Sequence, residues 1–173
     1  YSVVQHMNDD PTGIQYDSTI NNYEGTSYGS MTTTDLVTGK IGNAVDFDGS
    51  DDVISVGQIF TDDWTQFSMS AWVNHDVFAD DRIFSKAPST TVSTCIMHLA
   101  VEPTGKMRVR LSTDGTGATP AASKDSVSAP SNQAWHLFSW TWDAATATMS
   151  LYIDGNFEVS YPWDGDTVAD SDI

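Results

Sequence analysis

Short segments in which every second residue is apolar constrain the fold of this 173-residue chain most strongly. In residues 67–73 (FSMSAWV), the apolar side chains fall on one face of an extended strand, and residues 136–142 and 149–153 alternate in the same way. No stretch keeps the apolar period of an amphipathic helix, about 3.6 residues, over three turns. Apolar residues at every second position, in short segments separated by closely spaced turn residues, predict an all-β sandwich or barrel.

Two turns stand out between the predicted strands. In Gly39–Val56, apolar strand formers end at Phe47 and resume at Val53, with the turn-forming sequence DGSDD between them. This pattern predicts a β-hairpin. The Asp154-Gly155 pair lies between two further alternating segments and is the strongest hairpin signal of the chain, typical of a type I′ turn.

Length and composition predict a single domain over residues 1–173. A chain of this size can bury a substantial core, and it contains neither a linker nor a repeat of fixed period. No apolar run reaches the roughly 18 residues of a membrane span, so we do not expect membrane insertion. No charged and then apolar leader precedes the first strand-like residues, which is typical of a mature or excised segment.

The formal net charge is −17, because 24 Asp and Glu residues stand against 7 Lys and Arg residues. Such acidity argues against binding of nucleic acid or anionic membranes through a basic patch. Two interpretations stay open. The carboxylates solvate the surface in a saline setting, or some of them bind a hard cation such as Ca²⁺. Solvation accounts for most of the charge, since a few metal sites would use only a handful of carboxylates.

Several stretches in a fixed order resemble the concanavalin A-like jelly-roll domains related to laminin G and the pentraxins. They are GKIGNAVDFDGSDDVISV, FSMSAWV, WHLFSWTWD and SLYIDGN, and the N-terminal residues resemble the opening of bacterial and archaeal cell-surface members. The resemblance covers nearly the whole chain. It implies an all-β, two-sheet antiparallel jelly-roll β-sandwich with a concave face, and non-catalytic binding as in most members.

The sequence departs from the family pattern at its end. Members usually close with a further strand, whereas this sequence stops at Ile173. We expect that strand to be missing here or to come from another chain. An incomplete sandwich has an open sheet edge, which is a template for pairing and hence for self-assembly.

The resemblance also implies a structural Ca²⁺ ion between the N-terminal loop and the acidic turn. Calcium takes about six to eight oxygen ligands, and loops supply carbonyl oxygens as well as carboxylates. The alternative is that these side chains cap turns and face water. The pattern is not an EF-hand loop, because Gly49 comes too early. The candidate metal ligands are Asp17, Asn22, Glu24, Asp48, Asp51 and Asp52.

Exposed aromatic side chains are the candidate glycan contacts, since a ring can cover the apolar face of a sugar. Trp72 lies opposite the apolar face of its strand, and Tyr161 and Trp163 lie near the C-terminal hairpin. For these residues the alternative is packing under loops or at a subunit contact.

The sequence does not predict an enzyme. A glycosidase needs two carboxyl groups at a fixed separation, but Glu24, Glu102 and Glu158 are isolated from one another in the sequence. No G-x-S-x-G pattern marks a nucleophilic serine, so the four histidines are expected to have ordinary strand or loop partners.

Together these features predict a non-catalytic recognition or adhesion module that binds a glycan or a protein surface and is stabilised by Ca²⁺. The alternative is a structural subunit of a virion, filament or cell-surface layer, completed by a neighbouring chain. Either function would place the protein outside the cell or on a cell or virion surface. A glycoside hydrolase is the third hypothesis.

Overall fold

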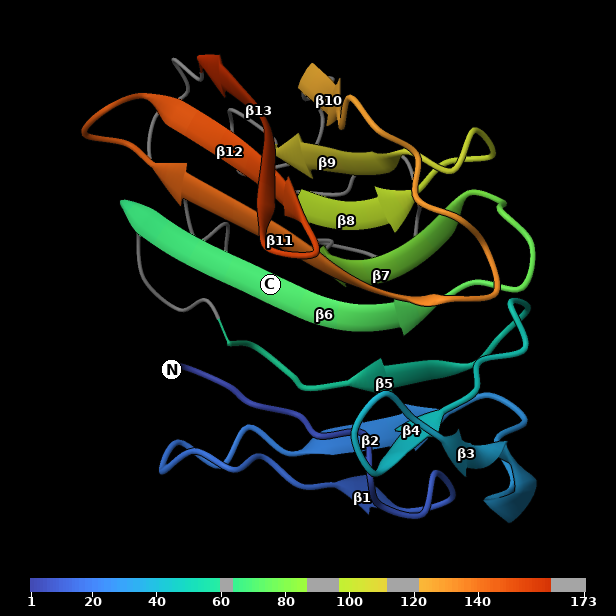
Figure 1. The fold of residues 1–173 in the computed structure, drawn as a ribbon. Helices are drawn as coiled ribbons and strands as arrows, with labels where there is room; N and C mark the ends of the chain where they lie inside the picture. Colours follow the sequence, from blue (N-terminus) through green and yellow to red (C-terminus); the bar gives the residue numbers. More distant parts are fainter. Residues whose placement is uncertain (60–63, 87–96, 112–121, 163–173) are drawn as a thin grey trace. The chain divides into compact units, whose positions relative to one another are not determined.

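The computed structural model describes residues 1–59, 64–86, 97–111 and 122–162. The chain divides into two compact units, Tyr1–Thr61 and Asp62–Ile173, and both are built from β-strands (Figure 1). The prediction of one domain stays a prediction. Among the described residues, no helix is both long and apolar enough to span a bilayer.

The N-terminal unit contains two small antiparallel sheets. The first has the strand order β1-β2-β5, and the second pairs β3 with β4. The single 3₁₀ turn before β3, η1, begins at a capping box formed by Thr32 and Asp35. The bounds are β1 Ile14–Gln15, β2 Gly25–Tyr28, η1 Thr33–Asp35, β3 Leu36–Thr38, β4 Asn43–Val45 and β5 Val53–Ser55.

The hairpin predicted within Gly39–Val56 is wrong, because its two strands pair with other partners. β4 pairs with β3, and β5 pairs with β2. A closer turn competes for β4: the amide of Gly39 donates to the carbonyl of Gly42, which lies at φ 66°. The acidic turn then leads β5 towards β2, where the Ser30 amide donates to Asp52 Oδ1 at 3.1 Å.

The described residues of the C-terminal unit form two four-stranded antiparallel sheets with the orders β10-β9-β8-β7 and β13-β12-β11-β6 (Figure 1). They confirm the predicted all-β jelly-roll sandwich. The first sheet comprises β7 Asp81–Lys86, β8 Met97–Val101, β9 Met107–Leu111 and β10 Ala122–Asp125. The second comprises β6 Gln66–Asn74, β11 Trp135–Asp143, β12 Thr148–Ile153 and β13 Asn156–Pro162.

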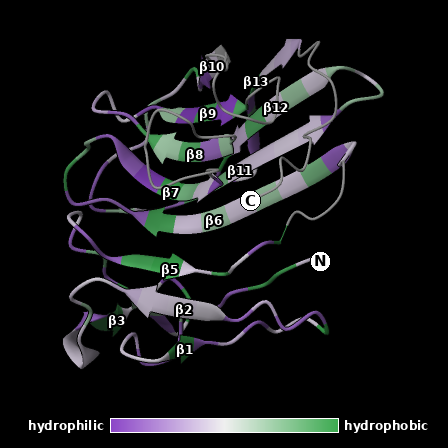
Figure 2. Ribbon diagram, turned by 180° about the vertical axis from the view of Figure 1, so that it is seen from behind, coloured by the Kyte–Doolittle hydropathy of each residue, from purple (hydrophilic) through white to green (hydrophobic). Residues whose placement is uncertain are grey.

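The core of this unit lies between the inner faces of the two sheets, as the alternation predicts. Trp140 and Trp142 are buried on β11, and the Phe67 ring meets the Trp140 ring edge-on at 4.7 Å between centroids. Hydrophobic and hydrophilic residues alternate along β9 (Figure 2). The apolar members of β8 and β9 on the inner face are fully buried: Met97, Leu99, Val101, Met107, Val109 and Leu111.

The Asp154-Gly155 turn joins β12 to β13 as the sequence predicts. Both residues have positive φ angles, 53° and 77°, which is the type I′ geometry. The turn fixes the pairing of Ile153 with Asn156. Asp154 also holds the turn against β11, because its Oδ1 accepts from the Leu137 amide at 2.8 Å. The register of β11, β12 and β13, and with it the outward face of this sheet, follows from these contacts.

Candidate functional site

The outward face of the β13-β12-β11-β6 sheet carries aromatic and apolar side chains at one end. Since Trp140 and Trp142 point into the core, the alternate residues of β11 point outward. We define this surface, the aromatic outer face, by five residues that the strand register places together: Trp72, Trp135, Leu137, Tyr152 and Phe157.

Two of these aromatic rings are accessible. Trp72, which pairs with Leu137 across β6 and β11, is 41% exposed, and Phe157 is 60% exposed. The Phe157 ring packs edge-on against Tyr152, with 5.7 Å between the centroids. Rigid aromatic side chains held in this way present apolar area at low cost in conformational entropy, because strand pairing already orders them.

Hydroxyl groups continue the same face beyond the aromatic end. Ser70 and Ser139 pair with each other beside the Trp72–Leu137 pair, and Ser139 also pairs with Tyr152. The next row contains only hydroxyl side chains: Ser68, Thr141, Ser150 and Ser160. A surface hollow at this end is lined by Gln66, Phe67, Ser68, Thr141, Trp142 and Asp143. Donors and acceptors therefore lie beside exposed rings, which suits a ligand with both apolar and hydroxyl-bearing sides.

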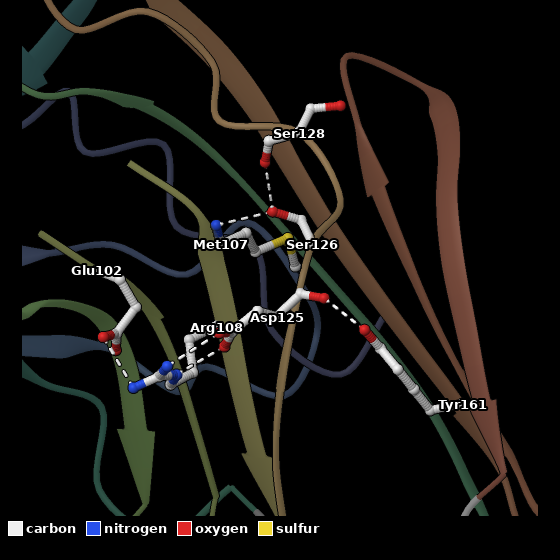
Figure 3. A network of polar contacts seen from close by, with 7 residues as sticks. All are labelled: Glu102, Met107, Arg108, Asp125, Ser126, Ser128 and Tyr161. Carbon is white, nitrogen blue, oxygen red and sulfur yellow. Dashed lines mark hydrogen bonds and ion pairs between the residues drawn. The ribbon is translucent and has the colours of Figure 1, made fainter. Parts of the chain in front are cut away.

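Tyr161, a predicted ligand contact, lies on the inner face of its sheet at the edge next to β10. Its hydroxyl donates to the carbonyl of Asp125 at 2.7 Å (Figure 3). Lys124 Nζ lies 4.9 Å from its ring centroid. These contacts give Tyr161 a structural partner in the other sheet. Trp163, the third predicted contact, lies outside the described residues.

The acidic turn brings together three of the six predicted metal ligands. Asp48, Asp51 and Asp52 each place a carboxylate oxygen within 4.8 Å of the others. The turn is also ordered by its own hydrogen bonds: Asp48 Oδ1 accepts from the Ser50 amide at 2.7 Å, and Asp52 Oδ2 accepts from the Asp48 amide at 3.1 Å. Oxygen ligands of this kind fit Ca²⁺, although backbone amides already use part of their capacity.

Asp17 is engaged differently from the acidic turn. It is 8% exposed, and its two oxygens accept from the amides of Val4, Thr19 and Tyr23 and from the Thr19 hydroxyl, at 2.7–3.0 Å. Burial opposes ionisation, but these four hydrogen bonds together outweigh it and lower the pKa of Asp17 from 3.8 to about 2. The charge of Asp17 therefore orders the N-terminal loop.

The remaining predicted metal ligands, Asn22 and Glu24, are exposed. Asn22 adopts a positive φ of 53°, and its side-chain amide donates to the Ile20 carbonyl at 3.2 Å. The carboxylate cluster formed by the acidic turn does not include Asp17 or Glu24. The ligand set implied by the sequence is thus brought together only in part.

Three carboxylates of the C-terminal unit are committed to ion pairs and hydrogen bonds. Arg108 binds Glu102 at 2.7 Å and Asp125 through a bidentate pair at 2.6 and 2.9 Å (Figure 3). The Arg108 hydrogen bonds hold the pKa of Asp125 below its ordinary value, while burial raises the pKa of Glu102. Glu158 accepts from the amide and hydroxyl of Ser128.

One Ser–His–Asp arrangement occurs at the start of β11. His136 Nδ1 lies 2.7 Å from Asp154 Oδ2, and its Nε2 lies 3.3 Å from the hydroxyl of Ser131. Asp154 belongs to the β12–β13 turn, so these contacts connect that turn to the loop before β11. We assign them a structural role, as expected for a histidine with ordinary loop partners.

The sequence of residues 48–172 matches the family model described as the concanavalin A-like lectin/glucanases superfamily. The chain belongs to this superfamily. No curated protein sequence matches this concanavalin A-like chain.

Solved structures share the fold of this concanavalin A-like chain. Domain 4 of AbnA, a GH43 extracellular arabinanase from Geobacillus stearothermophilus solved with arabinotriose, has a TM-score of 0.65 and 18% identity, covering 95% of this chain and 80% of that one. Residues 221–444 of an S-layer domain-containing protein from Clostridium thermocellum have a TM-score of 0.57 and 22% sequence identity. That match covers 94% of this chain and 73% of the other. At these identities the likeness concerns the fold alone.

Other similar structures are matched over a smaller part. The chain spans 27% of the length of a Bacteroides ovatus protein provisionally described as carbohydrate-binding, with a TM-score of 0.45, 16% identity and 60% of this chain covered.

The four hydrogen bonds to Asp17 generate a prediction about acid stability. The pKa of this carboxyl is about 2 in the folded chain against 3.8 ordinarily, so its ionised form stabilises the fold above pH 3.8. That contribution is lost as the pH falls from 3.8 towards 2. We expect Asp17→Asn to lower the urea midpoint at pH 7 and to lose less further stability below pH 3.8 than the parent protein.

The matched control is Asp46→Asn, which changes the same charge at an exposed position of the same unit. Urea unfolding followed by far-UV circular dichroism at several pH values measures both effects. Equal midpoints for the Asp17 variant and the parent protein at pH 7 would show that the hydrogen bonds to Asp17 do not stabilise the fold.

Proposed function

We propose that this chain is a non-catalytic carbohydrate-binding module and that the glycan binds the aromatic outer face. The observation that carries this proposal is the juxtaposition of exposed rings and hydroxyl groups on one sheet face. Trp72 and Phe157 offer apolar area for the faces of sugar rings. The rows around Ser139 and Thr141 offer hydrogen-bond partners for sugar hydroxyls.

The comparisons support this proposal at the level of the fold. The family is described as containing lectins and glucanases, and the arabinanase domain was solved with arabinotriose. Fold alone does not determine the ligand, so this likeness serves to choose a first probe. Arabinotriose and arabinan are the first ligands to test, followed by xylo- and cello-oligosaccharides.

The arrangement of carboxylates supports binding without hydrolysis. A glycosidase needs an acid and a second carboxylate that face the same bond. In the described part of the C-terminal unit, Glu102, in the turn between β8 and β9, is bound to Arg108, and Glu158, on β13, is bound to Ser128. Neither is among the residues that define the aromatic outer face. The hollow at its hydroxyl end is lined by one carboxylate, Asp143, which accepts from the Gln66 side chain.

We expect Trp72→Ala to weaken glycan binding by about tenfold or more, because aromatic side chains that a ligand buries on binding contribute most of the binding free energy at such surfaces. Phe157→Ala should weaken it less. Tyr16→Ala, which removes a ring that is 57% exposed in the other unit, should leave it unchanged. Affinity electrophoresis in arabinan gels and isothermal titration with arabino-oligosaccharides measure the effect.

Two outcomes would contradict the proposal. One is unchanged affinity in the Trp72 variant at a glycan that the parent protein binds. The other is no retardation of the parent protein by any neutral polysaccharide in a broad screen. Release of reducing sugar by the purified protein would instead support the glycoside hydrolase hypothesis.

We further propose that Ca²⁺ binds the acidic turn and stabilises the N-terminal unit, and that the module acts outside the cell in recognition or adhesion. The support is the closeness of the carboxylates of Asp48, Asp51 and Asp52, which repel one another without a cation or screening salt. When bound, the ion would supply positive charge to these carboxylates.

We expect millimolar Ca²⁺ to raise the melting temperature above that in EDTA, since a ligand that binds only the folded state stabilises it by mass action. Asp51→Asn should reduce this rise, whereas Asp46→Asn, an exposed carboxylate before the turn, should preserve it. Scanning calorimetry at low and high NaCl measures the shift. A rise that NaCl alone reproduces would mean that salt screens a self-repelling surface, and the calcium site would be abandoned.

The alternative function, a structural surface subunit completed by a neighbouring chain, stays a prediction. It requires ordered self-assembly through a sheet edge. Sedimentation at high protein concentration separates it from the binding module, because a module of the proposed kind binds glycan as a monomer.

A further inference from the structure

All three arginines of this acidic chain lie in the β10-β9-β8-β7 sheet, and all three lie on its outward face. Arg82 is on β7, and Arg108 and Arg110 are on β9. The inner face of β9 consists of buried apolar residues, so its alternate positions, 108 and 110, face outward. We name this surface the arginine face.

Strand pairing arranges the arginine face in two rows. Across the sheet, the first row reads Ser85, His98, Arg110 and Ser123. The second row reads Arg82, Ala100, Arg108 and Asp125. Directly paired residues have Cβ atoms about 5 Å apart. His98 therefore lies beside Arg110 in its own row and next to Ala100 along its own strand.

Arg108 and Arg110 differ in what satisfies their hydrogen-bond donors. Arg108 is neutralised on both sides, by Glu102 and by the bidentate pair with Asp125 (Figure 3). Arg110 Nε, in contrast, is buried and has no hydrogen-bond partner. The guanidinium group of Arg110 thus carries a charge that no described carboxylate offsets.

His98 has the same deficit. It is 6% exposed, and both of its ring nitrogens are buried without a hydrogen-bond partner. Buried polar atoms are almost always paired, because an unpaired one costs free energy. Three unpaired atoms on two neighbouring side chains therefore indicate a missing partner at this place.

The charge state of His98 fits an incoming anion. Burial, together with the positive charges of Arg82 and Arg110, lowers the pKa of His98 to about 4, against the smaller opposite effect of the Asp80 carboxylate. At neutral pH its imidazole therefore has one N–H donor and one acceptor. The positive charge around it comes from the arginines, of which Arg82, in the neighbouring row on the β7 side, is exposed.

We propose that the arginine face binds the carboxylate of an anionic sugar residue, a uronate, between Arg110 and Arg82 and beside His98. A carboxylate accepts two parallel N–H bonds from a guanidinium group, which suits the unpaired donor of Arg110. The exposed hydroxyls of Ser85 and Ser123, at the two ends of the first row, are placed to meet the hydroxyls of a sugar. We favour a uronate over an acidic peptide because its ring places hydroxyl groups around the carboxylate, where these two serines lie.

This site is separate from the aromatic outer face, because the two lie on opposite outward faces of one sandwich. It does not depend on the neutral-glycan proposal. Each can fail alone: Trp72→Ala tests the aromatic outer face with arabinotriose, and the arginine variants test the arginine face with a uronate.

The probe is trigalacturonate, compared with its fully methyl-esterified form, which keeps the sugar and removes the charge. We expect the free acid to bind the parent protein in isothermal titration and the ester to bind at least about tenfold more weakly. Arg110→Gln should lose about tenfold in affinity for the free acid, and Arg82→Gln, an exposed position that does not threaten folding, should lose several-fold. Lys40→Gln, with the same change of charge in the N-terminal unit, should change nothing.

Three results would overturn the proposal: no binding of the free acid, equal binding of acid and ester, or unchanged affinity in both arginine variants. The first would leave ordered water as the partner of His98 and Arg110. Competition by an aspartate-rich peptide or by sodium sulfate as effective as the uronate itself would also refute recognition of a sugar carboxylate. Circular dichroism melts of each variant separate loss of binding from loss of folding.

Discussion

Burial of the inner faces of the two four-stranded sheets determines which side chains of their strands point outward. Trp140 and Trp142 on β11 and the apolar residues of β8 and β9 are fully or almost fully buried. Because side chains alternate along a strand, this burial turns the intervening residues outward. A shift of one residue in β9 would bury Arg108 and Arg110, which is prohibitively costly without partners. Both proposed binding faces are therefore consequences of one core register.

The two outward faces differ because the intervening residues differ. On β11 and β12 they are tryptophan, leucine, serine, threonine, tyrosine and one aspartate, and the resulting surface has exposed rings beside hydroxyl groups. On β8 and β9 they are His98, Ala100, Arg108 and Arg110, and the surface is basic within a chain of net charge −17. One sandwich can thus have two separate sites, one for a neutral ligand and one for an anionic ligand, with no residue in common.

Features that depend on local sequence were predictable. The alternation in β6, β11 and β12 identified the core strands, and Asp154-Gly155 identified its turn. Features that depend on pairing between distant strands were not. β5 pairs with β2 rather than with β4, and the Ser30–Asp52 hydrogen bond beside this pairing joins residues 22 positions apart, which no local pattern reveals. The arginine face was missed for the same reason: MRVRL shows the alternation, but only the register with β8 places Arg110 beside His98.

Tryptophan indole resonances in a ¹H–¹⁵N correlation spectrum test the central claim most directly, since Trp72 is exposed whereas Trp140 and Trp142 are buried. The spectrum is recorded during titration with a mixture of arabino-, xylo- and cello-oligosaccharides. If glycan binds the aromatic outer face, the indole signals of Trp72 and Trp135 shift with saturation while those of the buried Trp140 and Trp142 stay in place. Saturable binding that leaves the Trp72 signal unmoved would contradict the proposed site.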